Sequence, residues 1–167
     1  MDFVSIIMGS KSDYEIMQNC SSVLEQFNVK YELIISSAHR SPQRTKDYIK
    51  AAEEKGAKVF VAAAGMAAHL CGVIAAMTPL PVIGVPIKAS LDGMDALLAI
   101  VQMPPGIPVA TVGINGSLNA AILAAQMIST GDAEMMNKVK AYKETLKEKI
   151  VKANEDLSKV EYKFKTN

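Results

Sequence analysis

The sequence has few of the residues that mark metal-binding, disulfide-rich or aromatic-rich proteins. It contains no tryptophan, two cysteines and two histidines in 167 residues. Cys20 and Cys71 form no CxxC motif and share no ligand-like spacing with the histidines. That pattern argues against a disulfide framework and against a zinc site, and it fits a reducing compartment. We therefore expect free thiols, no metal and a cytoplasmic location.

An excess of charge of one sign is also absent. The chain has 18 Lys and Arg against 17 Asp and Glu, a formal net charge of +1. This balance argues against a nucleic-acid binder that relies on a basic field. No apolar run reaches the ~18–20 residues of a membrane span, and the first residues lack the basic start and cleavage site of a signal peptide. We expect neither nucleic acid nor membrane as a partner.

The sequence does contain a regular alternation of short apolar runs and amphipathic stretches. Half of the residues are hydrophobic, which suits one globular domain. Because the runs are almost continuously apolar, they predict strands of a parallel sheet covered on both faces. The order predicts an α/β fold, a doubly wound five-stranded sheet in a three-layer α/β/α sandwich. The predicted strands are 3–8, 31–35, 59–64, 81–86 and 109–113, and the predicted helices are 13–27, 42–55, 67–77, 92–103 and 117–129.

The segment 133–160 differs from the rest because it is rich in Lys and Glu. Its apolar residues predict one long amphipathic C-terminal helix with a narrow stripe. The helix could fold back on its own sheet or pack on a neighbouring subunit. We expect one domain over 1–167, with an α/β core over 1–130 and a helical extension over 131–167. The stripe consists of Met135, Val139, Tyr142, Leu146, Ile150, Ala153 and Leu157.

Three predicted loops should meet at the carboxyl end of the sheet. In an open sheet of order 2-1-3-4-5, ligands bind beyond the carboxyl ends of the strands, between the first and third strands. The loops that follow the first three strands at this end are 9–13 (GSKSD), 36–40 (SSAHR) and 64–72 (AGMAAHLCG). Both histidines lie in these loops, so we expect a ligand at the carboxyl end of the sheet.

The loop 9–13 has the composition of a phosphate site. Gly9 allows a tight turn, and the hydroxyls of Ser10 and Ser12 stand beside the N–H groups that open the next helix. Asp13 is placed to accept two vicinal hydroxyls of a ribose. A structural explanation is equally open: Ser12 and Glu15 would form a capping box, and Asp13 would be a favourable charge in the first turn.

The other two loops supply an anion-binding group and proton carriers. The guanidinium of Arg40 matches phosphate oxygens, and His39 can give or take a proton near neutral pH. A lone loop histidine is more often solvated than catalytic. His69 could be a second acid–base group or a donor that holds its loop in shape. The small residues Ala64, Gly65, Ala67 and Ala68 would let a flat ring approach the backbone, although close helix–strand packing needs them too.

Several motifs recur here in order: MGSKSD, SSAHRSP, AAHLCGVIAA, LDGMDALLAIVQMPPGIPVATV and NAAILAAQ. Over about residues 3–130 they resemble the class I N5-carboxyaminoimidazole ribonucleotide mutases of bacterial purine biosynthesis. The resemblance implies a flavodoxin-like fold, one catalytic domain and no cofactor. It implies an isomerase that moves a carboxylate from the exocyclic nitrogen of its ribonucleotide substrate to carbon 4, giving 4-carboxy-5-aminoimidazole ribonucleotide. It also implies a homo-octamer whose terminal helix reaches a neighbour.

The resemblance carries roles onto single residues. It makes His39 the general acid–base. It assigns the phosphate and ribose contacts to Ser10, Ser12, Asp13 and Arg40, the base-binding loop to Ser37 and Ala38, and the imidazole and carboxylate pocket to the loop from Ala64 to Leu70, including Gly65, Ala67 and His69. Many members have glycine at Met66, proline at Cys71 and threonine at Ser41. Met66 therefore puts a side chain into a glycine-rich loop over the reacting ring.

Alternatives remain at this point. A direct aminoimidazole ribonucleotide carboxylase that uses carbon dioxide would share the fold and the histidine, although the AAHLCG loop and Arg40 favour the mutase. A non-catalytic flavin or nucleotide-binding module would not need His39. A pure assembly protein built on the terminal helix gives no reason for the polar groups gathered at the edge of the sheet.

Overall fold

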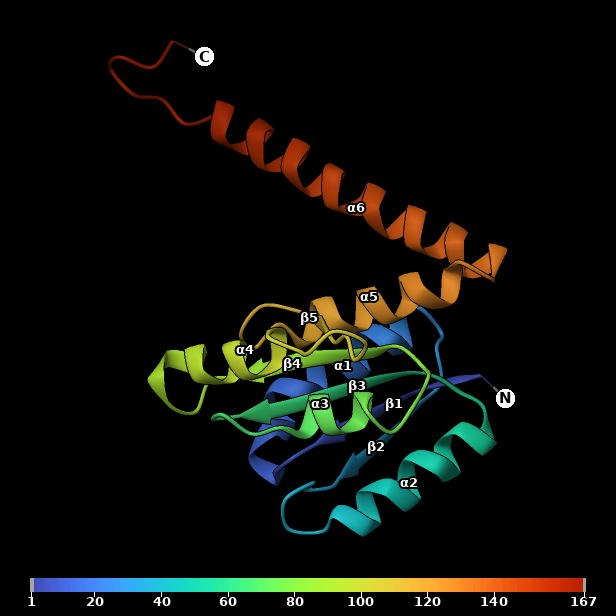
Figure 1. The fold of residues 1–167 in the computed structure, drawn as a ribbon. Helices are drawn as coiled ribbons and strands as arrows, with labels where there is room; N and C mark the ends of the chain where they lie inside the picture. The colour runs from blue at the N-terminus through green and yellow to red at the C-terminus, as the bar shows by residue number, and fades with distance from the viewer. Residues whose placement is uncertain (1, 167) are drawn as a thin grey trace.

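The strands form one parallel sheet between two layers of helices (Figure 1). The computed structural model describes residues 2–166. The strand order is β2-β1-β3-β4-β5, which confirms the predicted doubly wound topology. The strands are β1 (Phe3–Met8), β2 (Tyr31–Ile35), β3 (Ala57–Gly65), β4 (Val82–Ile87) and β5 (Ala110–Thr111).

Helices cover both faces of this sheet. On one face lie α1 (Tyr14–Gln26) and α5 (Ser117–Ser129). On the other lie α2 (Pro42–Lys55), α3 (Leu70–Ala75) and α4 (Met94–Val101). Short 3-10 turns, η1 (Lys11–Asp13) and η2 (Leu91–Gly93), precede α1 and α4. The sheet is thus the middle layer of a three-layer sandwich.

The strand β1 shows how the core is divided. Successive side chains of a strand point to opposite faces, so Val4 and Ile6 pack toward α1 and α5, whereas Phe3 and Ile7 pack toward α2 and α3. All six residues of β1 are buried. The one polar residue among them, Ser5, is satisfied by a hydrogen bond with the Tyr48 hydroxyl at 2.8 Å. β1 is therefore an interior, fully covered strand of the kind that continuous apolar runs predict.

Three predicted elements are shorter in the structure. The helix predicted over 92–103 spans only Met94–Val101, because Asp92 and Gly93 have positive φ angles of 55° and 86°. The run 109–113 gives only two residues of strand at the edge of the sheet. The helix predicted over 67–77 spans only Leu70–Ala75, because Met66 has a left-handed φ of 55° and the chain turns before the helix begins. The prediction that every strand is covered on both faces is wrong for β2, an edge strand whose Leu33 and Ile35 are exposed.

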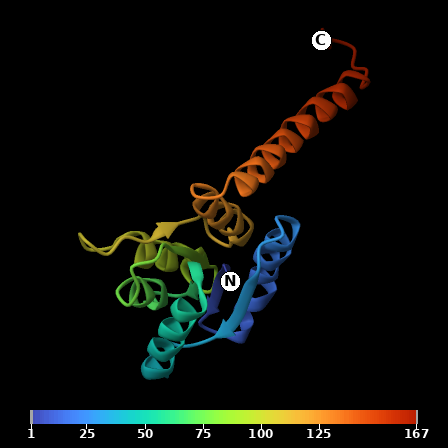
Figure 2. The same cartoon turned by 90° about the vertical axis from the view of Figure 1, so that its right-hand side faces the viewer.

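The last helix, α6 (Ala133–Ser158), packs on the body only at its beginning. Asp132 caps it by accepting a hydrogen bond from the Met135 N–H at 3.0 Å. Met135 and Val139 are buried, and the Tyr142 ring meets Phe27 with 5.4 Å between ring centroids. Beyond that point α6 projects away from the sandwich (Figures 1 and 2). Among residues 2–166 the structure has no helix long and apolar enough to cross a membrane.

Candidate active site

Backbone hydrogen bonds hold three loops together at the carboxyl end of the sheet. The Gly9 N–H donates to the Ala63 carbonyl at 3.1 Å, and the Ser36 N–H donates to the Met8 carbonyl at 2.9 Å. The loops after β1, β2 and β3 therefore leave the sheet side by side, as the topology predicts. They enclose a pocket of about 540 Å³. It is lined by Gly9, Ser10, Ser12, Asp13, Ser37, His39, Arg40, Gly65, Met66 and Ala89.

The first loop forms its own network of polar contacts. The capping box lies on Ser10 and Asp13, so the prediction that placed it on Ser12 and Glu15 is wrong by two residues. The Ser10 N–H donates to the Asp13 carboxylate at 3.0 Å, and the Ser12 hydroxyl donates to the Ser10 hydroxyl at 2.9 Å. The shift arises because a 3-10 turn, rather than α1 itself, follows the strand. Both serine hydroxyls line the pocket.

The Asp13 carboxylate occupies an electrostatically unfavourable place. Asp13 is only 5% exposed. Burial raises the pKa of the Asp13 carboxyl above its ordinary value of 3.8, and hydrogen bonds from the Ser10 backbone and the Ser12 side chain oppose that shift only partly. Carboxylates whose pKa is perturbed by burial in a cleft are candidates for ligand binding.

Asp13→Asn should show how much the burial of this carboxylate lowers the free energy of unfolding. Because the pKa of Asp13 is raised in the folded state, the folded protein holds the proton more tightly than the unfolded chain. The contribution of Asp13 to the free energy of unfolding should therefore fall as pH rises from 3.8 through the raised pKa. The variant lacks this decline, so in urea titrations it should gain stability relative to wild type between pH 3 and pH 7. Equal pH dependence in the two proteins would contradict this account.

The second loop is anchored by Ser37 and carries two groups into the pocket. The Arg40 N–H donates to the Ser37 hydroxyl at 3.2 Å, and the Ser41 N–H donates to the Ser37 carbonyl at 2.9 Å. This turn directs the Arg40 guanidinium toward the first loop, where Nη2 lies 3.4 Å from the Gly9 carbonyl oxygen. The long distance marks a weak contact. The fork of Arg40 therefore remains open to an anion.

The two histidines meet across the pocket edge. His39 Nε2 lies 3.3 Å from His69 Nδ1, and the rings stand nearly edge to face with 5.4 Å between centroids. One ring must donate and the other accept, so the contact fixes complementary tautomers. His69 occupies the N-cap position of α3, yet its side chain makes no capping bond. The imidazole of His69 thus serves His39 rather than its own helix.

The structure brings most of the predicted site residues together. Ser10, Ser12, Asp13, Ser37, His39, Arg40 and Gly65 line the pocket, and His69 contacts His39. Ala64 and Leu70, which are 2% and 3% exposed, pack in the core behind it. Ala38 also packs partly against that core, and Ala67 is exposed near the edge. Ala89 was missed, although it follows β4 at the same edge of the sheet.

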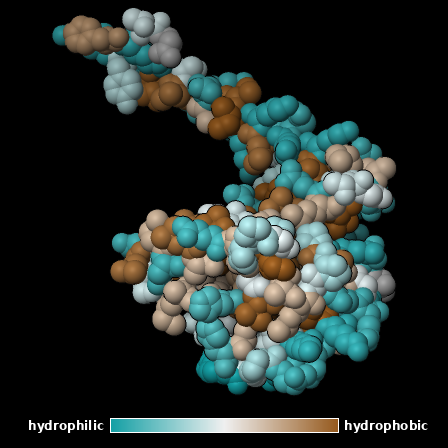
Figure 3. Space-filling view, in the orientation of Figure 1, coloured by the Kyte–Doolittle hydropathy of each residue, from teal (hydrophilic) through white to brown (hydrophobic). Residues whose placement is uncertain are grey.

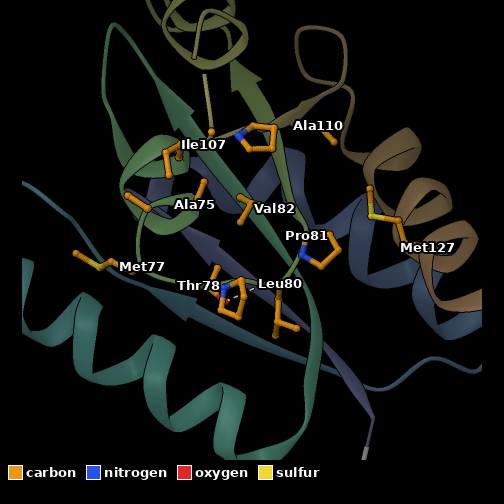
Figure 4. Close-up of a pocket in the computed structure, with 13 residues that line it drawn as sticks. Ala75, Met77, Thr78, Leu80, Pro81, Val82, Ile107, Ala110 and Met127 are labelled. Atoms are coloured by element: carbon orange, nitrogen blue, oxygen red, sulfur yellow. Dashed lines mark hydrogen bonds between the residues drawn. The ribbon is translucent and has the colours of Figure 1, made fainter. Parts of the chain in front are cut away.

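A larger groove lies at the opposite end of the strands, where β4 and β5 begin (Figure 4). Its volume is about 680 Å³. Its lining includes Met77, Leu80, Pro81, Ile107 and Met127, and no charged side chain is among the residues that form it. A phosphorylated ligand needs cationic or N–H donors. The smaller pocket at the carboxyl end is therefore the candidate active site.

Comparisons with known proteins identify the family of this chain. Residues 3–149 match the family model described as AIR carboxylase. The chain is 55% identical over 148 residues to the N5-carboxyaminoimidazole ribonucleotide mutase of Pyrococcus abyssi, covering 88% of this chain and 85% of that one. It is 49% identical over 161 residues to the phosphoribosylaminoimidazole carboxylase of Schizosaccharomyces pombe, covering 96% of this chain but only 29% of that protein.

The fold also has a solved relative. The crystal structure of Treponema denticola PurE matches with a TM-score of 0.86 at 30% identity, covering 94% of this chain and 99% of that one. The sequence match spans every strand and all three loops of the pocket. The resemblance drawn from the motifs is therefore confirmed. The chain belongs to the AIR carboxylase family.

Proposed function

We propose that this protein is an isomerase that converts N5-carboxyaminoimidazole ribonucleotide into 4-carboxy-5-aminoimidazole ribonucleotide in purine biosynthesis. The observation that carries the proposal is the meeting of a polar loop (Ser10, Ser12, Asp13), a guanidinium (Arg40) and an imidazole (His39) around one pocket. The first two groups suit a ribose phosphate, and the third suits proton transfer. The identity to named mutases supports the same assignment.

The reaction needs one proton carrier and a closed space. His39 gives a proton to the exocyclic nitrogen, the N–C bond of the carbamate breaks, and carbon dioxide is released beside the ring. Carbon 4 then attacks the carbon dioxide, and His39 takes the proton that leaves carbon 4, so protons and electrons balance. Phosphate contacts remote from carbon 4 would orient the ring. No ATP is consumed in this sequence.

The assay that tests the proposal offers each substrate separately. With N5-carboxyaminoimidazole ribonucleotide and no ATP, we expect the carboxylated imidazole to form. With free aminoimidazole ribonucleotide at low bicarbonate, we expect little turnover. Efficient use of the free amine would instead identify a direct carboxylase, the second candidate, which the similarity to the fungal carboxylase favours. Specific binding without turnover of either substrate would identify a nucleotide-binding module.

We also propose that the protein is a homo-octamer in the cytoplasm. Both cysteines are free and buried, which fits a reducing compartment. The stripe of α6 that is buried at Met135 and Val139 continues as Leu146, Ile150 and Leu157, which are exposed. Figure 3 shows apolar side chains along the projecting part of this helix. Because these residues extend an already buried surface, the occupant we assign to them is a second copy of this chain.

Charge placed on the exposed half of the stripe should disrupt the assembly. Leu146→Glu combined with Ile150→Glu puts two carboxylates into an apolar contact, so light scattering should detect smaller species than in wild type. Lys140→Gln combined with Lys152→Gln makes the same change in net charge at exposed positions on the sides of α6 away from the stripe and should leave the mass unchanged. An unaltered mass in the first double variant would refute an interface at this stripe.

A further inference from the structure

Met66 combines two features that folding alone does not explain. Its φ of 55° lies in the left-handed region, which a side chain beyond glycine or asparagine rarely adopts. Its apolar side chain is also 61% exposed. Neither the backbone conformation nor the exposure stabilises the fold. Strain of this kind clusters at ligand sites. Leu91 shares both features, with a φ of 44° and 76% exposure, but it lies outside the pocket lining, so the position of Met66 is what distinguishes it.

The position of Met66 indicates what that use is. It follows Gly65 at the end of β3 and lines the same pocket as His39 and Arg40. The other residues that line the pocket are glycine, serine, alanine or charged or polar side chains. Met66 is therefore the one large apolar side chain on a lining that must hold carbon dioxide and a flat ring. A flexible thioether chain can adjust to a ligand without a fixed shape.

We propose that Met66 is a mobile cover that closes over the imidazole and retains carbon dioxide during its transfer. The proposal rests on the function proposed above. When the N–C bond breaks, carbon dioxide either reacts with carbon 4 or escapes and leaves free aminoimidazole ribonucleotide. A cover that excludes water and blocks escape favours the first outcome. Met66 thereby sets how often the original carboxylate carbon reaches the product.

An isotope experiment measures this partition directly. N5-carboxyaminoimidazole ribonucleotide of natural abundance is supplied to the full protein in ¹³C-bicarbonate with carbonic anhydrase, and the label in the product is read by mass spectrometry. In wild type most product should be unlabelled. Met66→Ala and Met66→Gly should raise the labelled fraction and the free amine at least about five-fold, because the space is no longer closed. Met66→Leu keeps an apolar cover and should resemble wild type.

The two small replacements also serve as a structural control. Met66→Gly relieves the left-handed backbone whereas Met66→Ala retains it, so Met66→Gly should resist urea better. A cover predicts that both variants lose carbon dioxide equally in spite of that difference. A labelled fraction that followed stability, or that stayed at the wild-type value in both variants, would overturn the proposal.

A readout without catalysis separates this proposal from the proposed function. Hydrogen peroxide oxidises exposed methionine to the sulfoxide, and a cover resting on a ligand should react more slowly. Saturating aminoimidazole ribonucleotide should slow oxidation of Met66 about five-fold but leave Met94, which is 48% exposed and outside the pocket lining, unchanged. Binding without protection would refute the cover alone. Absence of binding would refute the cover and the proposed function together.

Discussion

Replacing His39 with asparagine should lower kcat by about 10³-fold while nucleotide affinity stays within a few-fold of wild type. Asparagine keeps a polar group of similar size in the loop but cannot carry a proton near neutral pH. The phosphate and ribose contacts come from other residues of the pocket, so binding should persist. Steady-state kinetics for turnover and calorimetry with aminoimidazole ribonucleotide would measure the two effects separately.

The neighbouring histidine gives a matched control for this variant. His69 lies 3.3 Å from His39 and is also exposed at the edge of the pocket. His69→Asn removes an imidazole from the same place and leaves a good N-cap residue at the start of α3. We expect a loss of less than about ten-fold in kcat, because His69 orients His39 but does not reach the pocket lining. Equal losses in the two variants would assign the proton transfer to the pair.

Arg40→Met should raise KM by about 10- to 100-fold, with a smaller effect on kcat. A hydrogen bond to a charged group contributes about 1.5–3 kcal/mol, which corresponds to that range. Methionine retains much of the aliphatic chain but removes the guanidinium that we assign to the phosphate. The present contact of Arg40, 3.4 Å to the Gly9 carbonyl oxygen, is weak and leaves the group free for a ligand. Steady-state kinetics at low and high salt would measure the change and its ionic component.

Arg44 provides the control for charge alone. It lies four residues further along the chain, in the first turn of α2, is exposed, and does not line the pocket. Arg44→Met makes the same chemical change and should leave KM within about two-fold of wild type, since isolated surface charges contribute little. A similar rise of KM in both variants would indicate general attraction of the anion rather than a specific phosphate contact.

The strands of the sheet could be predicted because each of them is a short apolar run in the sequence. Val82–Ile87, for example, is buried throughout and matches the predicted run within one residue. β5 was predicted too long, because an apolar run at the edge of a sheet does not show how many of its residues form hydrogen bonds with the neighbouring strand. The late start of α3 depends on the left-handed φ of Met66, which its sequence neighbours do not indicate.

The loops of the site could be predicted more easily than the contacts within them. Topology alone brings the predicted loops 9–13, 36–40 and 64–72 to the carboxyl end of the sheet, so their composition was enough to indicate a pocket. The contact between His39 and His69 joins residues 30 positions apart and depends on side-chain orientation. The burial of Asp13 likewise depends on a 3-10 turn that the helix-start signal at Ser12 and Glu15 obscured.

The measurement that tests the central claim most directly is a crystal structure of the full assembly with aminoimidazole ribonucleotide bound. We predict that the phosphate lies between the Ser10 and Ser12 hydroxyls and the Arg40 guanidinium, with the ribose at Asp13 and the imidazole ring beside His39. A nucleotide bound in the uncharged groove where β4 and β5 begin, or a His39 ring turned away from the ligand, would contradict the account.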